Sequence, residues 1–306
     1  MVVQRKDIAD FAVNILARGT LGFMSLLPYR TRVALFGRIF EHVVAPLAGW
    51  RKRVRENLAY VCPDLPDSEV KRLEHAVANN AGRSLIEIYS GATFKKHAAS
   101  MPITGPGLKA LEDAREQGRP VVLVTGHFGN YDAPRAALID RGFNIGALYR
   151  PMSNRFFNEH YVKSVAEIGS PIFPSSRKGQ VEMMRFLRGG GVLGFFIDNH
   201  TSSGVAMDFF DKPAMTSLSA AVMALKYNAL LLPVWGIRGS DGFSFEIRTG
   251  TPVEHSDPET MLAELNRELE HVTRDHMDQW FWIHRRWKPE IIEKVQRRRA
   301  AAKTDP

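Results

Sequence analysis

From about residue 102 onward, short apolar runs typical of buried β-strands alternate with longer helical patterns. Clear examples of such runs are PVVLVTG at 120–126, FNIGALY at 143–149 and VLGFFID at 192–198. Strands that alternate with helices indicate a mostly parallel sheet covered by helices on both faces. In sheets of this kind, sites form beyond the carboxyl ends of the strands. We therefore predict an α/β fold whose chemistry lies where these strands end.

The other patterns downstream of residue 102 agree with this fold class. SPIF at 170–173 predicts a short strand, and LLLPVWGIR followed by FSFEIRTG predicts two strands joined by a turn at 239–242. The segment 257–287 predicts one long closing helix. Upstream, residues 1–100 have a mainly helical pattern. We find no internal repeat that would indicate a repeat architecture.

The N-terminal part combines apolar stretches with basic residues. Residues 8–27 and 33–50 are both apolar, but neither reaches the ~18 uninterrupted apolar residues of a strong membrane-spanning helix. Each stretch predicts an amphipathic helix that either lies in a membrane interface or packs on the domain. We divide the chain into a helical membrane-associated segment, 1–55, and an α/β domain, 56–306.

The chain is basic, with a formal net charge of +8. This favours an anionic partner such as nucleic acid, acidic lipid headgroups or an acidic carrier protein. The basic residues cluster at 51–55, at 285–288 and at 294–299, without the interleaved aromatic residues of nucleic-acid-binding sheets. We therefore predict no nucleic-acid partner. The single cysteine, Cys62, excludes an internal disulfide.

His127 and Asp132 are the candidate catalytic pair. His127 follows the strand at 120–126, and Asp132 begins the next helix. Gly126 and Gly129 let the chain fold back, so that the carboxylate can reach one imidazole nitrogen and leave the other free to accept a proton. Such a pair activates a substrate hydroxyl without a protein nucleophile. In the alternative interpretation, Asp132 only caps the helix and His127 is a polar strand end.

Three basic side chains are candidates for binding an anionic group. Arg150 directly follows the strand at 143–149, where a guanidinium suits a phosphate or carboxylate, or else forms an ion pair within the loop. Arg177 and Lys178 begin the helix after SPIF, and helix N-termini with basic side chains bind anions. The alternative for these two residues is an ordinary capped turn.

Two further polar residues lie at strand or helix ends. Asp198 ends the strand at 192–198, where it can orient Arg150 or His200, or cap a helix. Asn154 most simply caps the helix that follows it. The ten histidines include no His-x-x-x-His pair with an intervening glutamate, so we predict no metal site and no cofactor.

The sequence HFGNYD at 127–132 resembles the H-x4-D/E motif of the glycerolipid acyltransferase superfamily. The chain is most similar to the lipid A biosynthesis acyltransferases, the late lauroyl or myristoyl transferases. Further blocks resemble that family in the same order: RKRVRENLAYVCPDLPDSE, YRP followed by Asn154, GFFIDNH, MDFFDKPAMT and MDQWFWIHRRWKP. The sequence departs from the family pattern in having Asn199 where glutamine is usual and Asp211 where glycine is usual.

The resemblance implies transfer of a fatty acyl chain from an acyl carrier protein thioester to a hydroxyl of a lipid A precursor or a related glycolipid. Acyl-coenzyme A is the alternative donor. His127 would be the general base, and the residues that bind substrate would be Arg150, Asn154, Asp198, Arg177 and Lys178. The resemblance also implies that the protein is located at the cytoplasmic face of the cell inner membrane. The alternatives are a lysophospholipid or aminolipid acceptor, and a peripheral membrane-binding protein without catalysis.

Overall fold

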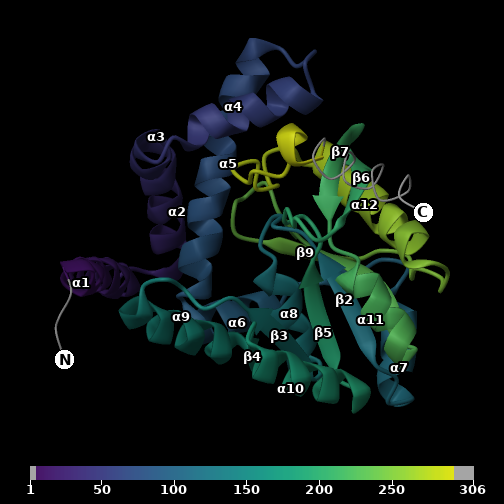
Figure 1. Ribbon diagram of the computed structural model, residues 1–306. Helices are drawn as coiled ribbons and strands as arrows, with labels where there is room; N and C mark the ends of the chain where they lie inside the picture. Colours follow the sequence, from purple (N-terminus) through teal and green to yellow (C-terminus); the bar gives the residue numbers. More distant parts are fainter. Residues whose placement is uncertain (1–4, 293–306) are drawn as a thin grey trace.

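A seven-stranded sheet forms the centre of the computed structural model, which describes residues 5–292. Its strand order is β1-β9-β8-β2-β5-β3-β4 (Figure 1). Every neighbouring pair is parallel except β8 and β9, which form an antiparallel hairpin. The strands are β1 (Ile103–Thr104), β2 (Val121–Thr125), β3 (Ile145–Tyr149), β4 (Ile172–Pro174), β5 (Val192–Phe196), β8 (Leu230–Arg238) and β9 (Phe245–Thr249). The predicted mostly parallel α/β fold is confirmed.

Helices cover both faces of the sheet (Figure 1). The alternating residues of β2 divide between two apolar clusters, because successive side chains of a strand point to opposite faces. Val122 and Val124 belong to one cluster, with residues of the helices α10 (Arg177–Arg188), α11 (Ser219–Tyr227) and α12 (Pro258–Asp275). Val121 and Leu123 belong to the other cluster, with residues of the helices α6 (Gly91–Ala99), α7 (Leu108–Glu116), α8 (Asp132–Asp140) and α9 (Arg155–Ile168).

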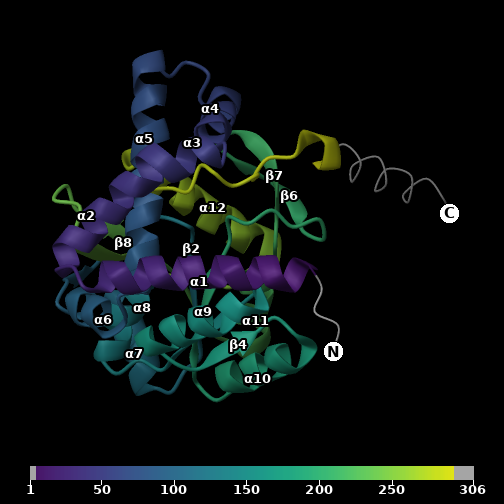
Figure 2. The ribbon, with the colours of Figure 1, turned by 90° about the vertical axis from the view of Figure 1, so that its left-hand side faces the viewer.

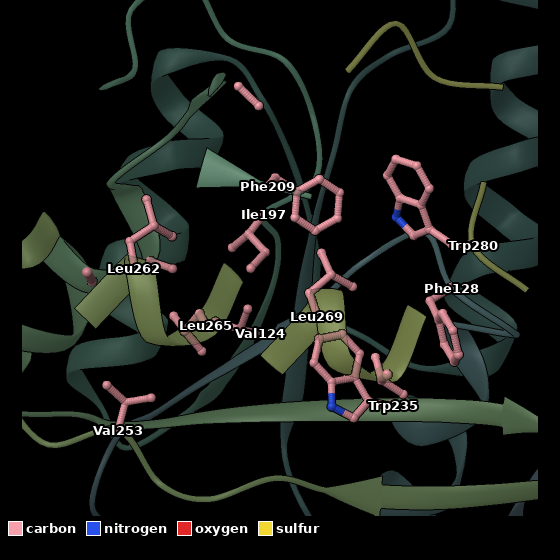
Figure 3. Close-up of a cluster of buried hydrophobic side chains, with 14 of the residues drawn as sticks. Val124, Phe128, Ile197, Phe209, Trp235, Val253, Leu262, Leu265, Leu269 and Trp280 are labelled. Carbon is pink, nitrogen blue, oxygen red and sulfur yellow. The ribbon is translucent and has the colours of Figure 1, made fainter. Parts of the chain in front are cut away.

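Helix α12 supplies the largest apolar contribution to the first cluster. Leu262, Leu265 and Leu269 of this helix belong to the same cluster as Trp235 of β8 and Trp280, and Figure 3 shows Leu269 beside Trp235. All five side chains are buried, at 1% exposure or less. At roughly 1.5–3 kcal/mol for each fully buried large apolar side chain, this cluster firmly fixes the carboxyl ends of the neighbouring strands.

The first part of the chain is helical, as predicted, and packs beside the carboxyl edge of the sheet (Figures 1 and 2). Its elements are α1 (Arg5–Ser25), α2 (Tyr29–Ile39), the π-helix η1 (Phe40–Val44), α3 (Ala45–Leu47), α4 (Trp50–Val61) and α5 (Asp67–Ile88). Helix α4 continues across residue 55, so no helix ends at the domain boundary that we predict there. Within residues 5–292, no helix combines the length and apolar character that a membrane span requires.

Residues 257–287 do not form one long helix, which corrects the prediction for this range. Helix α12 ends at Asp275, and residues 276–287, called the closing segment below, continue without a further helix. The backbone of this segment pairs with the turn after β2: the N–H of Gly129 donates to the carbonyl of Gln279, and the N–H of Phe281 donates to that of His127, both at 2.9 Å. These backbone bonds replace the helical bonds that the amphipathic pattern favours.

A two-stranded hairpin that the sequence did not predict lies between β5 and α11. It consists of β6 (Val205–Phe209) and β7 (Lys212–Thr216). Phe210 and Asp211 form its turn and have positive φ angles of 53° and 54°. Glycine adopts such angles without steric cost, and aspartate does so more readily than most other residues. This explains how Asp211 is tolerated at a position where the similar family has glycine.

Candidate active site

The parallel pairing of β2 and β5 brings His127 and Asp198 together. Thr125 pairs with Phe196 in the register of these strands, and each is followed two residues later by one member of the pair. Asp198 Oδ1 lies 2.9 Å from His127 Nδ1, and Asp198 Oδ2 accepts the backbone N–H of His127 at 2.6 Å. The side chain of Asp198 is fully buried, and that of His127 is 23% exposed. The carboxylate thus holds one ring nitrogen and leaves Nε2 able to accept a proton.

Asp198 lies in an environment that favours its ionised form. Burial alone would raise the pKa of this carboxyl, but the charge and hydrogen bonds of His127 hold it well below its usual range. Trp280 adds a third donor, with Nε1 at 3.0 Å from Asp198 Oδ2. A carboxylate that accepts three hydrogen bonds is fixed in orientation, so it also fixes the plane of the imidazole that it contacts.

Asp132 has a different partner from the one that the sequence predicts. Its Oδ1 lies 3.5 Å from NH1 of Arg135, one helical turn later. Burial raises the pKa of Asp132, and Arg135 opposes this effect. Among the described residues no hydrogen bond joins Asp132 to His127. Nor does its side chain cap α8: Asn130 Oδ1 accepts the N–H groups of Asp132 and Ala133, at 3.0 and 3.2 Å.

A buried ion pair supports the turn that carries His127. Glu87 of α5 accepts two hydrogen bonds from the guanidinium of Arg238, both at 2.7 Å, and a third from Asn130 Nδ2 at 2.7 Å. Ser84 donates to the carbonyl of Gly129 at 2.7 Å and accepts from Arg238. The turn is therefore fixed from one side by α5 and β8, and from the other by the closing segment.

A second histidine lies against the first. The ring centroids of His284 and His127 are 4.5 Å apart, in an edge-to-face arrangement. Burial lowers the pKa of His284 to about 4, with a further lowering from His127, so His284 is neutral near pH 7. Asn57 of α4 donates to the carbonyls of Trp282 and His284, at 2.6 and 2.9 Å, which holds the closing segment in place.

His127 lies at an apolar cavity of about 180 Å³ between α5, η1 and the closing segment. The walls include mainly aromatic and aliphatic side chains: Phe40, Trp50, Val77, Leu85, Tyr131, Trp280 and Phe281. Few polar groups other than the His127 imidazole line it, among them Asn80, Ser84 and Gln279. A cavity of this composition suits an alkyl chain, with a proton acceptor at its wall.

The basic residues chosen from the sequence lie elsewhere. Arg150, Arg177 and Lys178 are exposed, and none is among the described residues that line the cavity. Lys178 Nζ lies 3.9 Å from Glu182. Asn154 caps α9, as the sequence indicates: its side chain accepts the N–H groups of Phe156 and Phe157, the second and third residues of the helix, each at 3.1 Å. The roles of Arg150, Asn154, Arg177 and Lys178 in binding substrate stay predictions.

Comparison with known proteins identifies the chain. Residues 6–289 match the family model described as bacterial lipid A biosynthesis acyltransferase. The chain belongs to this family. It is therefore an acyltransferase, which uses an acyl donor and a lipid acceptor.

Named relatives of this acyltransferase cover most of both chains. It is 24% identical to a lipid A biosynthesis acyltransferase of Haemophilus influenzae over 85% of this chain and 84% of the relative. It is 23% identical to the lipid A biosynthesis lauroyltransferase of Escherichia coli over 88% and 89%. It is also 22% identical to a phosphatidylinositol mannoside acyltransferase of Mycobacterium tuberculosis over 80% and 79%.

Sequence reasoning did not assign site roles to Trp280 and His284. Both lie in the block MDQWFWIHRRWKP, which resembles the family and of which the sequence predicts the part up to Trp287 to be helical. The sequence signal that could have indicated a site role is that this histidine and this tryptophan lie within a block that resembles the family. Their position beside His127 depends on the return of the closing segment to the turn after β2.

The low pKa of His284 predicts a pH-dependent stability. The unfolded chain takes up a proton near the ordinary value of 6.5, whereas folded His284 does so only near 4. The unfolded state therefore binds more protons between these values, and the free energy of unfolding should fall as pH drops through this window. We expect His284→Gln to reduce the difference between denaturant unfolding at pH 7 and at pH 5. His271→Gln, at an 80% exposed histidine, should leave the difference unchanged, and an equal effect of both changes would contradict the assignment.

Proposed function

We propose that this acyltransferase moves a fatty acyl chain from a carrier thioester to a lipid hydroxyl, with His127 as general base. The observation that carries the proposal is the His127–Asp198 pair, with Nδ1 held by a buried carboxylate and Nε2 free of hydrogen bonds to the described residues. Nε2 takes the proton of the acceptor hydroxyl while its oxygen attacks the thioester carbonyl carbon. The new C–O bond forms, the C–S bond breaks, and the proton on His127 passes to the leaving thiolate.

We propose a lipid A precursor or a related glycolipid as the acceptor. Family membership supports this class, and the apolar cavity beside His127 supports an acyl chain in the site. The relative named for phosphatidylinositol mannoside supports a different glycolipid as the second candidate. A lysophospholipid or aminolipid acceptor has no comparable support among the relatives named above. The exposed Arg150 is proposed to bind an anionic group of the acceptor, as its position after β3 predicts.

The acceptor is tested by purified enzyme and by lipid mass spectra. Purified protein is incubated with one acyl donor and, in parallel, with a lipid A precursor, a mannosylated phosphatidylinositol and a lysophospholipid. Acyl transfer to the lipid A precursor, and loss of one acyl chain from lipid A in a strain that lacks the gene, is the expected outcome. Acyl transfer only to another acceptor by the purified enzyme, together with unchanged lipid A in the strain that lacks the gene, would contradict the proposed acceptor. The proposed role of His127 would not be affected. Absence of thioester cleavage with every acceptor would contradict the catalytic proposal itself.

We propose acyl carrier protein as the donor. The chain carries a net charge of +8, and acyl carrier proteins are acidic, so the two attract over about one Debye length, ~8–10 Å at ordinary salt. We expect the carrier thioester to react faster than acyl-coenzyme A of the same chain length at low salt, and this advantage to shrink as salt rises. A preference for acyl-coenzyme A that salt does not change would contradict this donor.

We propose that α1 rests on a membrane surface, the cytoplasmic face of the inner membrane. Helix α1 and the turn after it expose seven large apolar side chains: Ile8, Phe11, Val13, Ile15, Leu16, Phe23 and Leu26. An exposed apolar area of this kind typically marks an interaction site. The basic residues of helix α4, in the same N-terminal helical part, favour anionic lipid. Helix α1 is attached to α9, where Asn154 Nδ2 donates to the carbonyl of Asp10 at 2.7 Å.

Vesicle binding should depend on the apolar side chains of α1. Leu16 is 72% exposed. We expect Leu16→Asp to weaken cosedimentation with vesicles that contain anionic lipid, because it replaces an inserted apolar group by a charge. Thr20→Asp adds the same charge at an exposed polar position of the same helix and should weaken binding much less. Equal effects of the two changes would mean that charge alone, not insertion, governs the binding.

A further inference from the structure

Glu41, His42 and His75 bring three ligand atoms together between η1 and α5. His75 Nδ1 lies 3.1 Å from Glu41 Oε1, and His42 Nε2 lies 3.5 Å from the same oxygen. The three atoms all lie within 4.8 Å of one another. The histidine side chains are 59% and 41% exposed, and that of Glu41 is 19% exposed, so an ion can reach the group from solvent.

The spacing fits a tetrahedral transition-metal ion. Zn²⁺ binds imidazole nitrogen and carboxylate oxygen at about 2.0–2.2 Å, which places tetrahedral ligand atoms about 3.3 Å apart. Two of the three separations here, 3.1 and 3.5 Å, lie close to this value. Two imidazoles and one carboxylate also form a donor set that suits Zn²⁺ better than Mg²⁺, which prefers oxygen ligands.

The second oxygen of Glu41 is already oriented. Asn79 Nδ2 of α5 donates to Glu41 Oε2 at 2.8 Å, which turns Oε1 toward the two histidines. Hydrogen bonds of this kind to a ligating carboxylate are common around protein metal sites and strengthen binding. Glu41 and His42 are adjacent within a π-helix, a rare element that occurs frequently at functional sites.

The same π-helix forms a wall of the cavity at His127. Phe40 begins η1 and lines that cavity. Its ring lies over Gly82 of α5, where an added Cβ would come within 2.7 Å of the Phe40 Cγ. A link between η1 and α5 therefore holds Phe40 against the helix that it packs on.

We propose that Glu41, His42 and His75 bind a divalent transition-metal ion of the Zn²⁺ class, which fastens η1 to α5 beside the cavity. The site is separate from the acyl-transfer chemistry and does not depend on it. Spacing along the sequence could not indicate it, because His75 comes from a different helix and lies 33 residues beyond His42. The sequence-based expectation of no metal site considered only histidines close together in the chain.

Titration of metal-free, full-length protein with ZnCl₂ by calorimetry tests the site. We expect one ion to bind, with weaker binding by more than ~10–100-fold in His42→Ala and in His75→Ala, since losing a ligand should exceed the loss from a supporting residue. Zn²⁺ should also raise the thermal unfolding temperature of the unaltered protein, while MgCl₂ should not. His42 is exposed, so His42→Ala should fold as the unaltered protein does, which circular dichroism checks.

Two controls make the result specific. His271→Ala removes an exposed histidine whose Nε2 lies 3.8 Å from Asp275 but which belongs to neither group of three ligand residues found among the described residues, and Zn²⁺ binding should be retained. His127→Ala disrupts the other described group of this kind, His127, Asp198 and His284, and the ion should again be retained. Absence of Zn²⁺ binding, or binding that His42→Ala and His75→Ala leave unchanged, would overturn the proposal.

Discussion

Replacing His127 with alanine is expected to lower the turnover number by ~10²–10⁴-fold, the range typical of a lost general base. The change removes the only titratable side chain among the described residues that line the apolar cavity, apart from the tyrosine hydroxyl of Tyr131. Burial raises the pKa of Tyr131 well above its ordinary value, so this hydroxyl cannot replace the imidazole near pH 7. Initial rates at saturating donor and acceptor measure the effect. Turnover close to that of the unaltered enzyme, with intact folding, would show that another group takes the proton.

Two aspartate variants distinguish the orienting carboxylate. Asp198→Asn keeps the shape of the side chain but removes the charge that faces His127 Nδ1, so we expect a loss of turnover that approaches that of His127→Ala. Asp132→Asn leaves the contact between Asp198 and His127 in place and should have a much smaller effect on turnover. The opposite order of effects would restore Asp132 as the partner that the sequence favours.

Breaking the Glu87–Arg238 pair should have the largest effect on stability. Both side chains are buried, at 0% and 5% exposure, and each is the main charged partner of the other. Glu87→Ala leaves a buried guanidinium without its carboxylate, and removal of one partner of such a pair costs about 3–5 kcal/mol. The free energy of unfolding from denaturant titration measures this loss. Turnover should fall as well, because Glu87 also holds Asn130 in the turn after His127.

An exposed pair provides the control for this experiment. Lys109 and Asp113 lie 2.8 Å apart on the surface of α7, and Lys109→Ala should leave the free energy of unfolding unchanged within error. The double change Glu87→Leu with Arg238→Met removes both charges, so it should destabilise less than Glu87→Ala alone. Equal stability of Glu87→Ala and the unaltered protein would show that water enters and solvates Arg238.

Six strands of the central sheet and their order along the chain could be predicted from the sequence: β2, β3, β4, β5, β8 and β9. Strand β1 and the β6–β7 hairpin could not be predicted, and neither could the neighbours of each strand in the sheet. The runs at 120–126 and 192–198 predict strands at nearly the positions of β2 and β5. Their pairing depends on β5 inserting between β2 and β3, which no local pattern records. The sequence therefore favours Asp132, the carboxylate nearest in the chain, as the partner of His127, and it predicts Asp198 only as a residue that binds substrate. In the structure Asp198 contacts the imidazole.

The closing segment shows a second limit. The spacing of apolar residues in 276–287 continues the helical pattern of α12, so the local sequence alone predicts a helix there. The observed path results from tertiary hydrogen bonds: Gln279 exchanges side-chain bonds of 2.8 Å with the backbone N–H and carbonyl of Arg238, in β8. Such bonds between residues about 40 positions apart are invisible to periodicity. The exposed basic residues Arg150, Arg177 and Lys178 were located correctly at helix and strand ends, which local signals do specify.

The return of the closing segment to the turn after β2 also sets the order in which the protein can mature during synthesis. A nascent chain that has reached residue 250 already contains all seven strands of the sheet. It still lacks Trp280, which donates to Asp198, and Gln279 and Phe281, whose backbones pair with Gly129 and His127. A chain that ends between these points therefore has all the strands of the sheet but lacks the contacts that hold the turn carrying His127 from the other side.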